Sequence, residues 1–257
     1  MWNAETCLAA LFLATVFLCG GKLQAHRHRW RRAGISAAAG AAMAYVFIRL
    51  MPDLSEASDV YAGGASQKAM RLAETHVYLA ALAGFVFFYG LEHMVAWSRR
   101  AATTGEIERK SSDPIFLLHI GGFAAYGAVV SYTMVRGIGE ASVPIILYAL
   151  AMALHFLSVD HSLRREHGAA YERPGKYILA AAVVAGWACA LITRIPEATV
   201  AILLGVVSGG VIMNSTIMEL PREKEGRFWA FFLGAAVYAT ILLLLFARTG
   251  VSAGSGP

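Results

Sequence analysis

Apolar residues gather in eight runs along the chain, and charged residues fall mostly in the gaps between them. Each run is close to the roughly 20 residues that a helix needs to cross a bilayer. In lipid, a helix satisfies its backbone polar groups within one segment, so each run predicts a membrane span. The runs cover residues 5–20, 34–51, 75–97, 114–135, 142–161, 177–194, 198–220 and 228–248. We therefore expect an all-α, polytopic membrane helical bundle of eight transmembrane helices, forming a single transmembrane domain over 1–257.

Basic residues alternate between the two sides of this predicted bundle. Sixteen of the 22 lysines and arginines lie in the first, third, fifth and seventh gaps, and Arg49 lies inside the second run. Because cytoplasmic loops carry an excess of Lys and Arg, the odd gaps are expected in the cytoplasm and both termini outside. The longest outer gap, 52–74, contains acidic residues and glycines and predicts a loop.

Composition narrows the class of protein. The chain is 58% hydrophobic and only 15% charged, which disfavours a soluble domain. The net charge of +5 comes from the gaps, and no basic, aromatic surface indicates nucleic acid as a partner. Three cysteines lie inside apolar runs without a CxxC pair, which disfavours a disulfide framework or zinc ribbon. Glu5 precedes the first run and basic residues follow it, so we expect a retained span rather than a cleaved signal. Short loops favour a bacterial cytoplasmic (inner) membrane.

Ionisable side chains within the runs are few, and inside a membrane such groups indicate function by default. Most of these side chains lie in the half of the membrane nearest the predicted cytoplasmic side. Two polar side chains lie deeper, toward the middle of the membrane. The first group is Glu92, His93, His119, Asp160, His161 and Glu219, and the deeper pair is His155 and Asn214. Carboxylates and imidazoles bind divalent metals such as zinc, iron(II) and manganese, and they also relay protons. The sequence therefore predicts a polar, inward-facing cavity that holds a cation.

Structural roles that involve no metal ion also stay open for these side chains. Those near span ends can meet interfacial water, while His119 and His155 can make structural hydrogen bonds. Arg49 can pair with Asp53 one helical turn away. His155 and Asp160 are five residues apart, or roughly 140° around a helix. They converge on one ion only if the helix bends or another helix contributes ligands.

Motifs for enzyme chemistry are not found in a suitable context. No GxSxG, Walker A, HExxH or GxGxxG motif lies in a strand–helix context. Ser158 follows His155 by three residues, which allows an intramembrane nucleophile or a simple helix–helix contact. We therefore expect a protein that is not an enzyme, in which any transport would be driven by concentration and membrane potential.

The layout of the runs and two short motifs resemble the ZIP family of metal transporters, whose members have eight spans and both termini outside. The second run ends in FIRLMPD at 47–53, where the family carries a Leu-Leu-Pro-Glu-like sequence. The seventh run passes through glycines at 209–210 and ends in ELP at 219–221, similar to a Leu-Pro-Glu-like end in the family. The resemblance covers most of the chain in layout.

This resemblance implies a metal site between the fourth and fifth spans. His119 fits the start of the family's His-Asn-x-x-Asp-like motif. His155 and Asp160 fit the first and sixth positions of its His-Glu-x-x-His-Glu-like motif. The other named positions of the two motifs here hold Ile120, Phe123, Phe156 and Val159. The two-metal centre of typical members is thus reduced to about one site.

The resemblance implies a membrane transporter of a divalent metal cation such as zinc. Its ligands would be His119, His155 and Asp160, with Asn214 and Glu219 as further oxygen donors. The metal ion and the lipid bilayer are the expected partners, no resident cofactor is expected, and a homodimer stays open. The replaced ligand positions favour an alternative function, a non-transporting membrane scaffold or sensor on the same fold.

Overall fold

The computed structural model describes residues 2–25, 28–62, 67–103, 114–136, 145–216 and 228–249, and this part of the chain is helical without any strand. The elements are α1 (Trp2–Ala25), α2 (His28–Tyr45), η1 (Val46–Leu50), α3 (Met51–Ala62), α4 (Gln67–Thr103), α5 (Pro114–Arg136), α6 (Ile145–His167), η2 (Tyr171–Gly175), α7 (Lys176–Ile192), α8 (Glu197–Asn214) and α9 (Phe228–Thr249). The elements η1 and η2 are single π-helical turns. The predicted all-α fold is confirmed.

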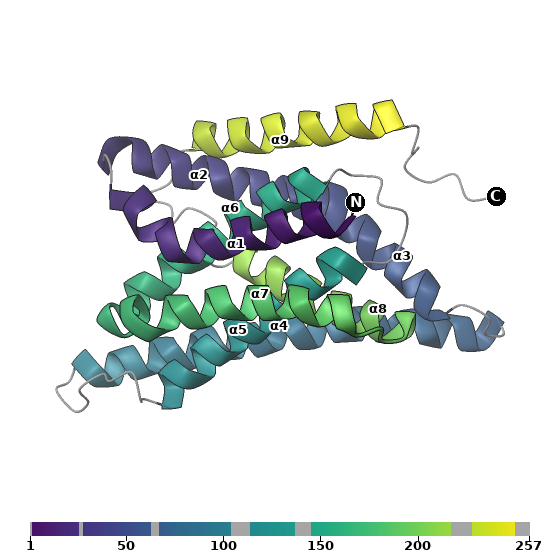
Figure 1. Cartoon of the computed structure of the whole chain (residues 1–257), viewed down its shortest axis with the longest axis horizontal. Helices are drawn as coiled ribbons and strands as arrows, with labels where there is room; N and C mark the ends of the chain where they lie inside the picture. The colour runs from purple at the N-terminus through teal and green to yellow at the C-terminus, as the bar shows by residue number, and fades with distance from the viewer. Residues whose placement is uncertain are drawn as a thin grey trace.

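Seven helical segments in the described ranges are long and apolar enough to cross a membrane. They fall in α1, in α2 with α3, in α4, in α5, in η2 with α7, in α8 and in α9. Helix α6, with 23 residues, is an eighth helix of similar length. In Figure 1, α1 begins and α9 ends toward the same end of the bundle. The chain is thus a multi-pass helical bundle with seven or eight membrane-length helices.

Helices distant in the sequence pack side by side: α4 with α8, α2 with α9, and α5 with α7 (Figure 1). Glycines allow these close approaches. A Cβ atom at Gly209 of α8 would overlap the backbone of Ala81 in α4, and one at Gly234 of α9 would overlap the backbone of Ala37 in α2. Lipid is as apolar as the helices, so close packing of small residues is what holds such pairs together.

The second predicted span is longer than the sequence indicated. Residues Tyr45 and Met51 on either side of η1 keep right-handed helical angles, so α2, η1 and α3 form one continuous helix. The π-helical turn widens the helix just before Pro52, whose ring would otherwise crowd the preceding turn. Arg49 pairs with Asp53 at 3.0 Å, as their spacing allowed. The predicted loop over 52–74 is wrong for 52–62 and 67–74, which are helical.

Aromatic rings fill the middle of the bundle. Phe156 of α6 packs against Phe17 of α1 with ring centroids 5.0 Å apart, and against Tyr126 of α5 at 6.3 Å. Phe88 of α4 lies 5.2 Å from Phe123 and 5.3 Å from Tyr126. The resemblance to the ZIP family would place Phe123 and Phe156 at ligand positions of that family. Both are buried in one apolar core, so here these positions contribute packing.

Candidate metal centre

His119 is completely buried near the start of α5, and both of its ring nitrogens face polar groups. Nδ1 lies 2.8 Å from Nε2 of His167 and 4.0 Å from Oε2 of Glu166, in the last turn of α6. Nε2 lies 3.2 Å from Oε1 of Glu92 in α4. Three helices thus bring two imidazoles and two carboxylates together. We call these four residues the His119 centre.

The geometry of the His119 centre fits a small cation. Among the described residues, His119, Glu166 and His167 are the one group of three or more His, Cys, Asp or Glu whose ligand atoms all lie within 4.8 Å of one another. Ligands about 2.1 Å from a tetrahedral zinc stand roughly 3.4 Å apart. The distances of 2.8 and 4.0 Å from His119 Nδ1 lie on either side of this value, so small side-chain shifts would surround one ion.

Glu92 determines which nitrogen of His119 is free to bind an ion. A carboxylate accepts hydrogen bonds, so we assign the proton to Nε2, which donates to Glu92. Nδ1 then directs its lone pair toward His167 and accepts a hydrogen bond from Nε2 of that ring. Carboxylates commonly hold the far nitrogen of a metal-binding histidine in this way and raise its basicity. A bound ion would take the place of the proton between the two rings.

The end of α6 explains how Glu166 and His167 reach this position. No glycine or proline interrupts the chain from Ile145 to His167, so the helix continues past the predicted span end at 161. Gly168 then adopts φ +52°, a left-handed conformation that glycine accepts readily at a helix end. Its N–H donates to the carbonyl of Arg164 at 2.9 Å. Glu166 and His167 therefore both lie in the final helical turn.

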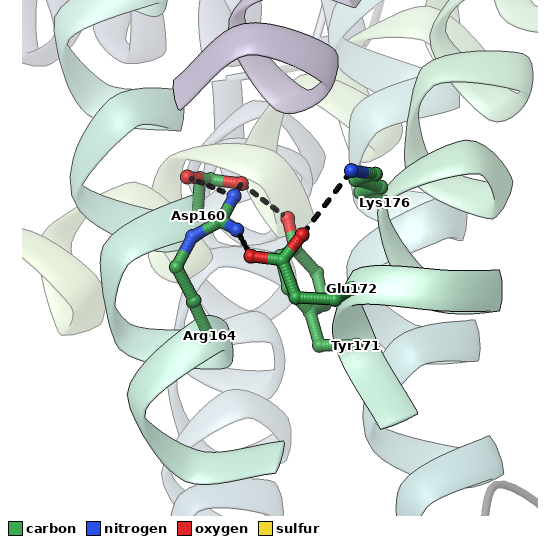
Figure 2. Close-up of polar contacts among 5 residues, drawn as sticks. All are labelled: Asp160, Arg164, Tyr171, Glu172 and Lys176. Carbon is green, nitrogen blue, oxygen red and sulfur yellow. Dashed lines mark hydrogen bonds and ion pairs between the residues drawn. The ribbon is translucent and has the colours of Figure 1, made fainter. Parts of the chain in front are cut away.

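Asp160 belongs to a separate group of side chains (Figure 2). Its buried carboxylate accepts hydrogen bonds from the Tyr171 hydroxyl at 2.7 Å and from Arg164 Nη2 at 3.0 Å. Arg164 also pairs with Glu172, and Lys176 Nζ lies 3.1 Å from the other oxygen of Glu172. We call these five residues the Asp160 network. Its two carboxylates and two cations balance in formal charge.

The remaining predicted ligands lie in other surroundings. Nε2 of His155 is 3.0 Å from the hydroxyl of Tyr126, within the aromatic core. Asn214 at the end of α8 is 2% exposed, and its Oδ1 has no hydrogen-bond partner among the described residues. A buried acceptor without a partner costs about 1–3 kcal/mol, so Asn214 is suited to receive a donor or an ion. Glu219 lies outside the described residues.

Of the predicted ligands in the described ranges, only His119 joins a group of side chains with the spacing to hold a metal ion. Ligand roles for His155, Asp160 and Asn214 stay predictions, since the first two hold protein partners and the third stands apart from this group. Sequence reasoning missed Glu166 and His167 because it placed them in a gap. The uninterrupted helical stretch up to Gly168 was the signal that could have found them.

Comparison with protein-family models and with curated proteins finds no match to this chain. The similarity to the ZIP family therefore rests on the layout of the spans and on the short motifs. The function has to be argued from the geometry of the His119 centre.

Proposed function

We propose that this protein is a ZIP-like membrane carrier of a divalent metal cation, with zinc as a suitable substrate. The single observation that carries the proposal is the convergence of His119, Glu166 and His167 at 4.8 Å or less. Polar groups are costly to bury in a membrane protein and are usually retained for function. A group with two imidazoles and a carboxylate, backed by Glu92, has the donor set of a zinc site with an open fourth position.

The donor set also selects among cations. Imidazole nitrogen favours zinc, iron(II) and similar borderline metals, whereas Mg²⁺ and Ca²⁺ favour oxygen ligands alone. The two carboxylates of the centre, Glu92 and Glu166, supply two negative charges when both are ionised. A divalent ion would therefore be neutralised locally, which lowers the cost of holding it away from water.

The direction of transport follows from the orientation expected of the bundle. With the odd gaps in the cytoplasm, the His119 centre lies toward the cytoplasmic side of a bacterial inner membrane, and both termini lie outside. A membrane potential of 100 mV favours inward movement of a divalent ion by about 4.6 kcal/mol. Entry down the concentration and potential gradients then needs no nucleotide.

Uptake into proteoliposomes tests this proposal. Vesicles that contain the wild-type protein and an interior zinc indicator should fill faster than protein-free vesicles when Zn²⁺ is added outside under an inside-negative potential. His167→Ala should abolish the difference, because it removes one of the two imidazoles. His93→Ala is the matched control, since His93 is exposed one residue from Glu92 and should leave uptake unchanged. Equal filling of protein-containing and protein-free vesicles would contradict the proposal.

A second candidate function is a non-transporting membrane scaffold or metal sensor. The observation that favours it is the aromatic core, in which Phe123 and Phe156 fill positions that carry ligands in the ZIP family. In this core the imidazole of His155 already contacts the hydroxyl of Tyr126, so an ion held at the His119 centre would compete with that contact on its way through the bundle. A scaffold predicts neither stoichiometric zinc in the purified protein nor zinc uptake by the vesicles, whereas a metal sensor predicts zinc binding without uptake.

A further inference from the structure

The two polar groups described above are attached to the same helix end. Arg164 belongs to the Asp160 network, while Glu166 and His167 of the His119 centre follow it by two and three residues. At about 100° per residue, Glu166 leaves the helix roughly 200° and His167 roughly 300° around the axis from Arg164. Glu166 therefore leaves the side opposite Arg164, whereas His167 leaves within about 60° of Arg164, so one helical turn carries side chains of both groups. A rotation or shift of this turn would change both groups together.

The turn at Gly168 joins two arms, α6 and η2. Its backbone is left-handed, and a Cβ atom placed on it would meet no heavy atom within 4 Å. The N–H of Glu172 donates to the carbonyl of Gly168 at 3.1 Å, so the backbone also links η2 to the turn. The ion pair between Arg164 in α6 and Glu172 in η2 joins the two arms. Arg164 also lies over the ring of Tyr171, 5.4 Å from its centroid, and Lys176 holds Glu172 from α7.

Helix α1 closes this group from the other side. A Cβ atom at Gly20 would overlap the carboxylate of Asp160, and one at Gly21 would come 2.6 Å from Nη1 of Arg164. The guanidinium of Arg164 is therefore confined by a carboxylate, an aromatic ring and the bare backbone of α1. A confined cation holds its helical turn in one position.

We propose that Arg164 and Glu172 are positioning residues, whose ion pair across the Gly168 turn holds Glu166 and His167 at the distance from His119 that a divalent cation requires. This inference rests on the proposed metal site and adds the part of the chain that sets its affinity. Neither residue touches the ion. Their effect is transmitted through the last turn of α6, and loosening the pair allows the two side chains to leave the ion.

Titration of the purified full-length protein with Co²⁺, followed by visible absorption, tests the inference. Glu172→Gln removes the charge of Glu172 with little change in size, and that side chain is 43% exposed, so the fold should persist. The variant should bind Co²⁺ about tenfold more weakly, as found when groups that support metal ligands are changed. Gly21→Ala should weaken binding similarly by displacing Arg164. Gly34→Ala is its control, because a Cβ atom there meets nothing within 4 Å.

A double-mutant cycle separates positioning from a general effect on the fold. In a Glu166→Gln background, Glu172→Gln should have a smaller effect on Co²⁺ affinity, because one of the side chains it positions has already been changed. Equal fold-losses in both backgrounds, or wild-type affinity in Glu172→Gln and Gly21→Ala, would overturn the inference alone. A wild-type protein that binds no Co²⁺ would overturn the proposed metal site and this inference with it.

Discussion

The two polar groups at the end of α6 differ in how their charges are balanced. The Asp160 network contains two carboxylates and two cations of the protein, and its hydroxyl and guanidinium donors occupy the buried carboxylate. The His119 centre contains two carboxylates that face imidazoles, which carry no charge in their neutral form. The network is complete without any ligand, whereas the centre has the composition of a site that a cation completes.

Because of this difference, substitutions in the two groups should affect different properties of the protein. Breaking a buried ion pair leaves an uncompensated charge, so the Asp160 network should contribute mainly to the stability of the bundle. Removing a neutral imidazole from the centre takes one hydrogen-bond donor from Glu92 but breaks no pair of opposite charges. Changes in the His119 centre should therefore act mainly on metal affinity, and the following variants test that division.

The largest effect on stability is expected for Asp160→Ala. Asp160 is fully buried, and its removal would leave the guanidinium of Arg164, which is only 18% exposed, with the partly exposed Glu172 as its remaining carboxylate in the network. The free energy of unfolding should fall by about 3–5 kcal/mol, measured by SDS titration in mixed micelles. A decrease below about 1 kcal/mol, the level of an exposed pair, would mean that the network is screened by water.

Next in size is the effect of His119→Leu on metal binding. Leucine keeps an apolar side chain of similar bulk in the core but removes the ring that faces His167, Glu166 and Glu92. Zinc affinity, measured by calorimetry, should fall by more than about 100-fold, beyond the range seen for groups that only support a ligand. Unfolding in the absence of metal should change far less than for Asp160→Ala. Unchanged zinc affinity would remove His119 from the site.

A smaller loss is expected for Glu92→Gln. The amide can no longer fix the tautomer of His119 or raise its basicity as a carboxylate does. Zinc affinity should fall by about 10- to 100-fold. Calorimetry against His93→Ala, which alters the next residue on α4, separates this effect from a general disturbance of the helix. A loss of the same size in both variants would contradict the role of Glu92.

The smallest effect is expected at the outer end of the Asp160 network. Lys176 pairs with Glu172, and the Glu172 side chain is 43% exposed, so solvent weakens this contact. Lys176→Gln should lower the free energy of unfolding by at most about 1 kcal/mol in the same SDS titration. A loss as large as that of Asp160→Ala would show that the network acts as one cooperative unit.

Much of the fold could be predicted because the bilayer imposes one dominant pattern. A span needs a long apolar run, and the runs 114–135 and 228–248 closely match α5 and α9. The segment after the second run could not be predicted, because Pro52 and nearby acidic residues are typical of loops. The widened turn of η1 accommodates the proline, and such a turn leaves no mark in hydropathy.

The site was less predictable, because it depends on where a helix ends and on which side chains face one another. Asp160 has the composition of a metal ligand, yet Arg164 and Tyr171 already occupy its carboxylate. Arg164 follows Asp160 by four residues, the spacing of a helical ion pair, whereas Tyr171 lies beyond the Gly168 turn, where spacing along the chain does not predict the contact. Glu166 and His167 lie beyond the apolar run, so hydropathy did not place them in the helix. The signal that marks the helix end is Gly168, which adopts a left-handed conformation.

Zinc K-edge X-ray absorption of the purified, zinc-loaded protein tests the central claim most directly. The account predicts about one zinc per chain, nitrogen and oxygen ligands near 2.0–2.2 Å, and outer scattering from two imidazole rings that drops to one in His167→Ala. Zinc below stoichiometric amounts, or a spectrum unchanged by His167→Ala, would contradict a cation site at the His119 centre.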